Sequence, residues 1–336
     1  MANAEPNDAS PRWAEVIIHM CLGVQPGEKV LVAVDEPLAF ARDALLAEAL
    51  KAQPSELWSW TIPNTARPMT EFSPRLIELL RQMDAAVVLW ASVDPVQEGS
   101  VMAQAIFDIT HRSSVRLAGG GFISQDILEN ELSADYEEIA VLTNALADWM
   151  QGRSTIHITT ALGTDLQLSA TGRRWRADTG IFRGPGFGNL PAGEVFIAPI
   201  EDSAEGVLVV DTSLPGLMLS EPIRLTFEKG RVVQIEGGEG VAYLEQLLAM
   251  SEGQPNAEWS RVIGELGIGT NPKARLQGNL MTDEKVAGTV HVALGRNDMF
   301  GGDNPAPMHI DMVVSQPTLR VDGDLLIENG RYLLNS

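Results

Sequence analysis

The sequence predicts an α/β domain with a doubly wound parallel sheet, followed by a mainly antiparallel β domain. Two patterns lead to this fold class. Continuous apolar runs alternate with helical segments from residue 29 to about 120, whereas apolar and polar residues alternate after residue 153. The first pattern is typical of parallel strands covered on both faces, and the second of strands with one solvated face. The chain has 336 residues, enough for two domains, which we place at residues 1–152 and 153–336.

The first half contains four expected strands separated by helical segments. These strands are KVLVAV (29–34), LWSWTI (57–62), AAVVLWA (85–91) and SVRLAG (114–119). No G-x-G-x-x-G follows the first strand, so the dinucleotide-binding fingerprint is absent where it would be expected. A further helix, from Ser133 to about Gln151, leads into the second half.

The second half consists mostly of short alternating strands. The segments are STIHITT, TDLQLSA, EVFIAP, GVLVVDT, IRLTFEKGRVVQIEGG, GTVHVALG, HIDMVV and LRVDGDLLIENGRYLL. Turns such as EKGR and ENGR are expected to join neighbouring strands as hairpins. One helix is expected near GVAYLEQLLAM (240–250).

Composition and charge exclude several classes of function. The formal net charge of −21 disfavours binding to nucleic acid and to anionic membrane surfaces. The one cysteine, Cys21, permits no intrachain disulfide and fits a reducing compartment. The N-terminal residues lack the regions of a signal peptide, and no run approaches the roughly 18 apolar residues of a membrane helix. We therefore expect a cytoplasmic protein that binds neither nucleic acid nor membrane.

A histidine and an aspartate enter an otherwise apolar strand in NPAPMHIDMVV (304–314). Side chains two residues apart on a strand point the same way, so His309 and Asp311 would lie roughly 7 Å apart along the backbone. This spacing suits two ligands of one metal ion.

Three more polar residues lie in apolar strands of the same half. Glu194 begins EVFIAP, Glu265 interrupts VIGELGIG, and His291 interrupts GTVHVALG. A single histidine in a strand is more often a core or surface residue than a ligand. A carboxylate in such an apolar context, however, needs a cation or a hydrogen-bonding partner. Together with His309 and Asp311, these residues predict a metal site.

Oxygen and imidazole ligands without thiolate suit zinc, cobalt, manganese or ferrous iron. Three carboxylates and two histidines exceed the needs of one catalytic metal, and they suit two divalent ions that share a bridging carboxylate. A purely structural metal is a weaker hypothesis, because such sites are often cysteine-rich. Glu284, in MTDEKVAGT, precedes His291 by seven residues. It is either a general base or part of a solvated turn.

Four segments of the second half carry a family resemblance: PAGEVFIAP, GELGIG, DEKVAGTVHVALG and HIDM. In these segments the chain resembles the aminopeptidase T family of metalloaminopeptidases. The resemblance implies an N-terminal α/β domain, a β-rich C-terminal domain with a dinuclear metal site, and a dimer. It also implies that Glu194, Glu265, His291, His309 and Asp311 bind the metals. Glu265 would be the bridging ligand, and Glu284 the acidic residue that assists the water.

The chain also looks like the related 2,5-dihydroxypyridine dioxygenases, which contain a single iron. The shared segments are EDSAEGVLVVD, FEKGRVVQIEGG, NPKAR and HIDM. In that family the positions of Glu194, Glu265 and His291 differ in residue type, so the sequence favours the peptidase-like site. We expect a metal-dependent hydrolase of amide bonds, most like an aminopeptidase, that acts on a small molecule or a short peptide. The alternative is an Fe(II) ring-cleaving dioxygenase acting on a dihydroxypyridine-like aromatic.

Overall fold

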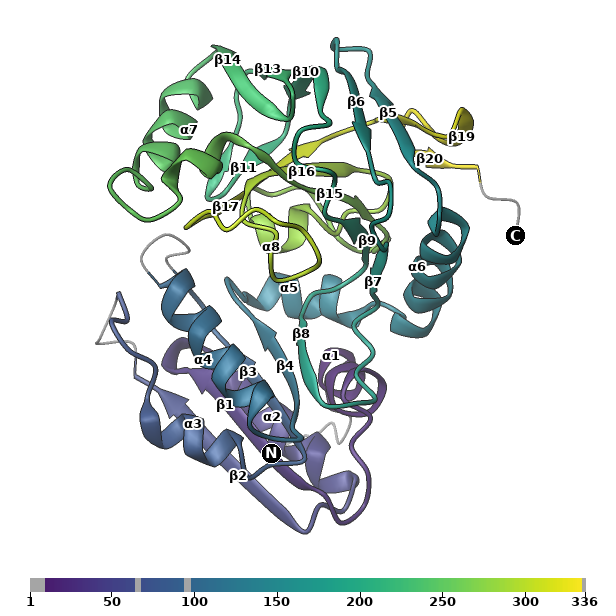
Figure 1. Cartoon of the computed structure of the whole chain (residues 1–336). Helices are drawn as coiled ribbons and strands as arrows, with labels where there is room; N and C mark the ends of the chain where they lie inside the picture. The colour runs from purple at the N-terminus through teal and green to yellow at the C-terminus, as the bar shows by residue number, and fades with distance from the viewer. Residues whose placement is uncertain (1–9, 64–67, 94–97, 334–336) are drawn as a thin grey trace, which may run out of the picture. The chain divides into compact units, whose positions relative to one another are not determined.

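The computed structural model describes residues 10–63, 68–93 and 98–333 (Figure 1). The chain forms two compact units. The first comprises Met1–Glu137 and Gly180–Leu190, and the second comprises Glu138–Thr179 and Pro191–Ser336. A parallel sheet with helices and two further sheets of antiparallel strands are present, which confirms the expected fold class. The domain boundary at residue 152 stays a prediction, since the compact units divide the chain at other positions.

The first unit is built on a five-stranded parallel sheet with the strand order β2-β1-β3-β4-β8. Its strands are β1 (Lys29–Asp35), β2 (Glu56–Ile62), β3 (Ala85–Leu89), β4 (Arg116–Gly120) and β8 (Gly186–Asn189). Its helices are α1 (Arg12–Glu15), a π-helix (Val16–Cys21), a 3₁₀ helix (Glu36–Leu38), α2 (Ala39–Lys51), α3 (Pro74–Leu80), α4 (Gly99–His111), α5 (Gln125–Glu129) and a second 3₁₀ helix (Glu131–Ser133). None of the helices in the described part of the chain is long and apolar enough to cross a membrane.

The fifth strand of this sheet, β8, was not expected from the sequence. Its residues GFGN contain two glycines and no β-branched side chain, so they lack the usual strand composition. The strand pairs in parallel with β4, where a Cβ at Gly119 would lie 2.6 Å from the ring of Phe187. The absence of a side chain at Gly119 therefore makes room for the aromatic ring of the neighbouring strand.

The second unit contains two sheets and the longest helix of the described chain. The helices are α6 (Tyr136–Met150), α7 (Gly240–Ala249), a 3₁₀ helix (Ala257–Arg261) and α8 (Leu280–Asp283). The eight-stranded sheet has the order β14-β13-β10-β6-β5-β18-β19-β20. Its strands are β5 (Thr155–Thr159), β6 (Asp165–Ser169), β10 (Glu205–Val210), β13 (Ile223–Glu228), β14 (Arg231–Gly237), β18 (Thr318–Val321), β19 (Asp324–Glu328) and β20 (Arg331–Tyr332).

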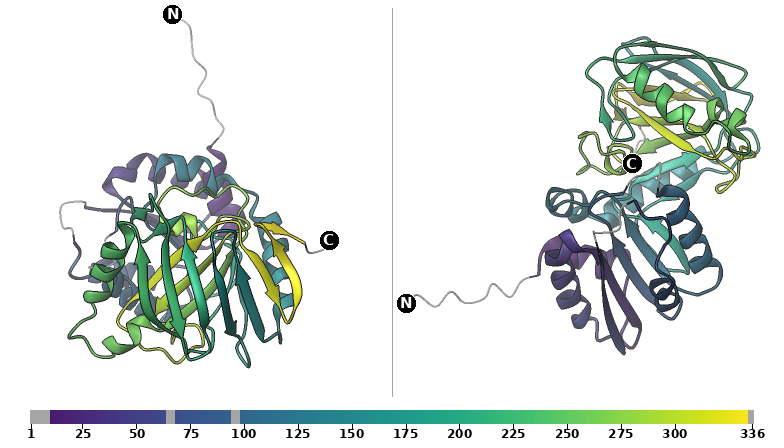
Figure 2. Two further views of the ribbon diagram at one scale, coloured as in Figure 1. Left: turned by 90° about the horizontal axis from the view of Figure 1, so that it is seen from above. Right: turned by 90° about the vertical axis from the view of Figure 1, so that its left-hand side faces the viewer.

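The other sheet has seven strands in the order β12-β11-β17-β16-β15-β9-β7. Its strands are β7 (Arg176–Asp178), β9 (Glu194–Ile197), β11 (Ser213–Leu214), β12 (Leu217–Met218), β15 (Ile263–Gly269), β16 (Val290–Gly295) and β17 (His309–Val314). One hydrophobic cluster takes side chains from both sheets and from helices α6 and α7. Helix α7 packs against β14, as the views in Figure 2 show. This shared core fixes the seven-stranded sheet, which carries the candidate site.

Both hairpin turns expected from the sequence are present. EKGR connects β13 with β14, and ENGR connects β19 with β20. The central residues of each turn have positive φ, at Lys229 (47°) and Gly230 (74°) and at Asn329 (46°) and Gly330 (76°). Two consecutive residues with positive φ match the right-handed twist of the flanking strands, as a two-residue hairpin requires.

Candidate metal centre

The five predicted ligands lie on four neighbouring strands of the seven-stranded sheet. Glu194 begins β9, Glu265 lies on β15, His291 on β16, and His309 and Asp311 on β17. These strands are adjacent in the order β17-β16-β15-β9. The folded chain therefore brings together all five residues, although Glu194 and Asp311 are separated by more than one hundred positions in the sequence.

The strand registers place the five side chains on one face of the sheet. Glu194 pairs with Gly269, and His291 pairs with Gly267. Gly267 and Gly269 lie two and four positions after Glu265 on β15, so all three point to the same face. Glu194 and His291 therefore share the face of Glu265. On β16, the partners of His309 and Asp311 are Gly295 and Ala293. These two residues lie four and two positions after His291, so His309 and Asp311 share the face of His291.

Small residues leave room for the ligands on this face. A Cβ built on Gly267 would lie 2.0 Å from Cε1 of His291, far inside van der Waals contact. Glycine at this position therefore allows the imidazole of His291 to lie across β15.

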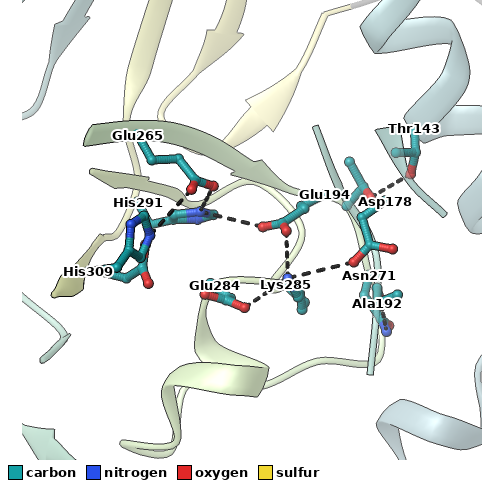
Figure 3. A network of polar contacts seen from close by, with 12 residues as sticks. Thr143, Asp178, Ala192, Glu194, Glu265, Asn271, Glu284, Lys285, His291 and His309 are labelled. Atoms are coloured by element: carbon teal, nitrogen blue, oxygen red, sulfur yellow. Dashed lines mark hydrogen bonds and ion pairs between the residues drawn. The ribbon is translucent and has the colours of Figure 1, made fainter. Parts of the chain in front are cut away.

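The carboxylate of Glu265 lies between the two histidines (Figure 3). Its Oε1 is 3.4 Å from Nε2 of His291, and its Oε2 is 3.3 Å from Nε2 of His309. Glu194 extends the group on one side, with Oε2 3.4 Å from Nε2 of His291. Asp311 extends it on the other, with Oδ1 3.2 Å from Nε2 of His309. Each oxygen of Glu265 thus faces a different imidazole.

This donor set fits divalent cations. Three groups, Glu194/Glu265/His291, Glu265/His309/Asp311 and Glu284/His291/Asp311, each offer ligand atoms within 4.8 Å of one another. In a tetrahedral site with bonds of about 2.1 Å, neighbouring ligand atoms lie about 3.4 Å apart, close to the distances above. Oε2 of Glu194 is buried and accepts no hydrogen bond from the described residues. A cation between these atoms would satisfy that oxygen.

Burial and mutual attraction shift the pKa values of the cluster strongly. Burial favours the neutral form of Glu265, but hydrogen bonds from His291 and His309 outweigh it and lower the pKa of Glu265 to about 2. For His291 burial lowers the pKa, yet Glu265, Glu194 and Asp311 raise it to about 9. At Glu194 burial dominates and raises the pKa to about 8. Without a cation the cluster therefore retains protons, which metal binding would release.

A second layer of contacts orients His309. Its Nδ1 lies 2.7 Å from the carbonyl oxygen of Arg296, which leaves Nε2 to face Glu265 and Asp311. The ring of Phe300 meets the His309 ring edge-on, with centroids 6.0 Å apart. A carbonyl partner on the other ring nitrogen is the usual way to fix a metal-binding histidine.

Glu201 anchors the loop that contains Arg296 and Phe300. Its Oε1 accepts hydrogen bonds from Nδ2 of Asn297 and from the backbone N–H of Asp303, at 3.0 Å and 2.7 Å. Its Oε2 accepts one from Nη2 of Arg173 at 2.7 Å. Glu201 therefore supports the metal centre through this loop.

Glu284 lies at the same cluster, directly after the short helix α8. It forms one of the three candidate ligand groups with His291 and Asp311, and its side chain is buried. Burial raises the pKa of Glu284 in spite of the neighbouring ammonium of Lys285. Glu284 therefore does not lie in a solvated turn, and it is placed where a proton acceptor could act.

Lys285 is a component of the site that the sequence did not reveal. Its side chain is fully buried, and Nζ donates hydrogen bonds to Oε1 of Glu194 at 2.6 Å and to Oε1 of Glu284 at 2.8 Å. Oδ2 of Asp178, on β7, is 3.8 Å away. Burial lowers the pKa of Lys285, but these carboxylates raise it well above its usual value. The only sequence signal is a lysine that follows two acidic residues in MTDEKVAGT.

Comparison with known proteins places this chain in a family. The family model NicX, described as 2,5-dihydroxypyridine 5,6-dioxygenase, matches residues 17–334. The chain belongs to the NicX family. Among curated relatives of this NicX-family chain, aminopeptidase T of Thermus thermophilus is 30% identical over 190 residues, which cover 50% of the chain and 44% of the relative. The 2,5-dihydroxypyridine 5,6-dioxygenase of Pseudomonas putida is 28% identical over 194 residues, which cover 54% of each.

The chain thus spans about half the length of the curated relatives it matches. Solved structures resemble the NicX-family chain over nearly all of its length. The 2,5-dihydroxypyridine dioxygenase from Pseudomonas putida KT2440 has a TM-score of 0.77 at 18% identity and covers 99% of both chains. AmpT from Thermus thermophilus has a TM-score of 0.70 at 19% identity, with 96% of this chain and 98% of that chain covered. These likenesses establish the fold, and both resemblances expected from the sequence are confirmed.

Proposed function

We propose that this protein is a metal-dependent amide hydrolase, most like an aminopeptidase, with a pair of divalent cations at its active site. The observation that carries the proposal is the position of Glu265, whose two carboxylate oxygens face two different histidines. One oxygen belongs to a ligand group with Glu194 and His291, and the other to a group with His309 and Asp311. Such a shared carboxylate is characteristic of two-metal hydrolytic sites.

The charge at the cluster supports two cations over one. Five carboxylates and one ammonium meet here, which leaves four negative charges once the carboxylates have released their protons and the histidines are neutral. The carboxylates are those of Asp178, Glu194, Glu265, Glu284 and Asp311, and the ammonium is that of Lys285. Uncompensated buried charge is costly, and two divalent cations would neutralise this cluster.

Two divalent cations, when bound, would polarise a substrate carbonyl and make a water molecule more acidic. The first cation would be held by Glu194, Glu265 and His291, and the second by Glu265, His309 and Asp311.

The chain itself supplies the proton acceptor. Oε1 of Glu284 is engaged by Lys285, so Oε2 of Glu284 would accept the proton of the attacking water and pass it to the leaving amine. The raised pKa of Glu284 suits a group that both accepts and donates a proton. The substrate class that fits this chemistry is an amino-acid amide or a short peptide.

A ring-cleaving dioxygenase is the second candidate, because the matching family model and one of the curated relatives carry that description. A non-haem Fe(II) oxygenase commonly uses two histidines and one carboxylate. Among the described residues, none of the three candidate ligand groups contains both histidines. This donor set favours hydrolysis.

The dimer and the cytoplasmic location expected above remain predictions.

The two candidates differ in their need for oxygen. We expect the zinc- or cobalt-loaded protein to hydrolyse amino-acid p-nitroanilides and dipeptides equally well in air and under nitrogen. We expect the Fe(II)-loaded protein to consume no oxygen with 2,5-dihydroxypyridine. Metal-free protein, prepared with a chelator, is the control in both assays. Oxygen uptake with the pyridine, together with no hydrolysis across the amide panel, would establish the dioxygenase.

A further inference from the structure

Lys285 is held rigidly next to the ligand cluster. Its carbonyl oxygen accepts a hydrogen bond from the backbone N–H of Asn271 at 2.8 Å, and its own N–H donates to the carbonyl of Thr282 at 3.0 Å. Asn271 is itself anchored, because its Nδ2 donates to the carbonyl of Ala192 at 3.0 Å. The backbone from which the Lys285 side chain extends is therefore fixed against the segments that flank β9 and β15.

The carboxylates around Lys285 come from three separate parts of the second unit. Asp178 on β7 is the register partner of Glu194 on β9, and Glu284 precedes Lys285 in the chain. The ammonium lies among all three, at 3.8 Å, 2.6 Å and 2.8 Å respectively (Figure 3). With no exposure to solvent, Lys285 has these carboxylates as its charge partners.

The two oxygens of Glu194 have different partners. Oε1 accepts the hydrogen bond from Lys285, whereas Oε2 points to His291, with 3.4 Å between Oε2 and Nε2. If the Lys285 ammonium took the place of a metal ion, it would lie between Oε2 of Glu194 and Nε2 of His291. Lys285 instead binds the other oxygen, Oε1, so its hydrogen bond fixes the rotation of the carboxylate without engaging Oε2.

We propose that Lys285 is a positioning residue that turns Glu194 so that its second oxygen can bind the cation shared with Glu265 and His291. The inference rests on the two-cation site proposed above and assigns a role to a residue outside the ligand set. Among the described residues, the ion pairs and hydrogen bonds of the Lys285 ammonium are with Asp178, Glu194 and Glu284, and none is with Glu265, His309 or Asp311. Its effect is therefore specific to one of the two cation positions.

The experiment is a zinc-binding titration of the full chain by equilibrium dialysis, with bound zinc measured by elemental analysis. We expect wild-type protein to bind two ions. In Lys285→Met, one ion should bind as in wild type, and the dissociation constant of the other should rise roughly 10–100-fold, as for other residues that orient metal ligands. Lys229→Met, which alters an exposed lysine in the β13–β14 turn, should leave both constants unchanged.

Two further variants separate positioning from ligation and from general stability. Glu194→Gln should lose the same ion, but excess zinc should restore full occupancy only in Lys285→Met, where all ligands are intact. The double variant Lys285→Met/Glu194→Gln should bind no more weakly than Glu194→Gln alone, because both changes act on one position. If Lys285→Met does not fold, Lys285→Met/Asp178→Asn removes one of the carboxylates left unpaired without changing a candidate ligand, and it is titrated instead.

The outcomes distinguish this inference from the proposed function. If wild-type protein binds two ions and the lysine variant binds both with unchanged or higher affinity, Lys285 has no positioning role, whatever its effect on the melting temperature. If wild-type protein binds fewer than two ions, the two-cation site itself is wrong, and the inference falls with it.

Discussion

Replacement of Glu265 by glutamine is expected to remove at least one of the two metal ions. Hydrolytic activity should fall by roughly 10³-fold or more, because charge stabilisation of several kcal/mol by the pair of cations would be lost. Glu265 is the one residue present in both the Glu194/His291 group and the His309/Asp311 group. An amide has one oxygen and one NH₂ group, so glutamine cannot offer an oxygen to each cation.

The measurement is metal content by elemental analysis together with hydrolysis of an amino-acid p-nitroanilide. Glu236→Gln is the matched control, because Glu236 is exposed on β14, and it should retain both ions and full activity. Retention of both ions by Glu265→Gln would show that Glu265 is not the bridging ligand.

Replacement of Glu284 by glutamine should lower kcat by about 10²–10⁴-fold, the usual contribution of general acid–base catalysis, with little change in metal content. Glutamine keeps the shape of the side chain, and its oxygen can still accept the hydrogen bond from Lys285. It cannot take a proton from water. Steady-state kinetics and metal analysis on the same preparation measure both effects.

The neighbouring Asp283→Asn variant provides a contrast. The carboxylate of Asp283 accepts hydrogen bonds from the backbone N–H groups of Gln277 and Gly278, at 2.8 Å and 2.9 Å. Its replacement should lower the melting temperature and leave kcat nearer to wild type. If Glu284→Gln instead loses a metal ion, Glu284 is a ligand of the Glu284/His291/Asp311 group and not the proton acceptor.

Much of the fold follows from the sequence pattern, because strand type is encoded locally. The apolar runs of β1 to β4 indicated a parallel sheet, and EKGR and ENGR indicated two hairpins, all of which are present. Strand β8 was missed because its place in the sheet depends on pairing with β4, which lies about seventy residues earlier. Its glycines carry no local strand signal.

The candidate site, too, could be predicted from the sequence only in part. Glu194 stood out because it begins an apolar strand, and Glu265 and His291 because each interrupts one. A buried polar residue needs a partner. That β9 lies beside β15 could not be read from the sequence, since this pairing joins segments about seventy residues apart. Lys285 and Asp178 were missed for a related reason. A lysine in an acidic turn is normally solvated, and its burial here depends on carboxylates from two other segments.

The most direct test of the two-cation hydrolase is a zinc titration of the metal-free protein under nitrogen, with hydrolysis of an amino-acid p-nitroanilide measured at each ratio of zinc to protein. We predict that hydrolysis reaches its full rate only when the second equivalent of zinc binds, and that admitting oxygen does not change this rate. A full rate at one equivalent, or no hydrolysis at any ratio with zinc bound, would contradict the account.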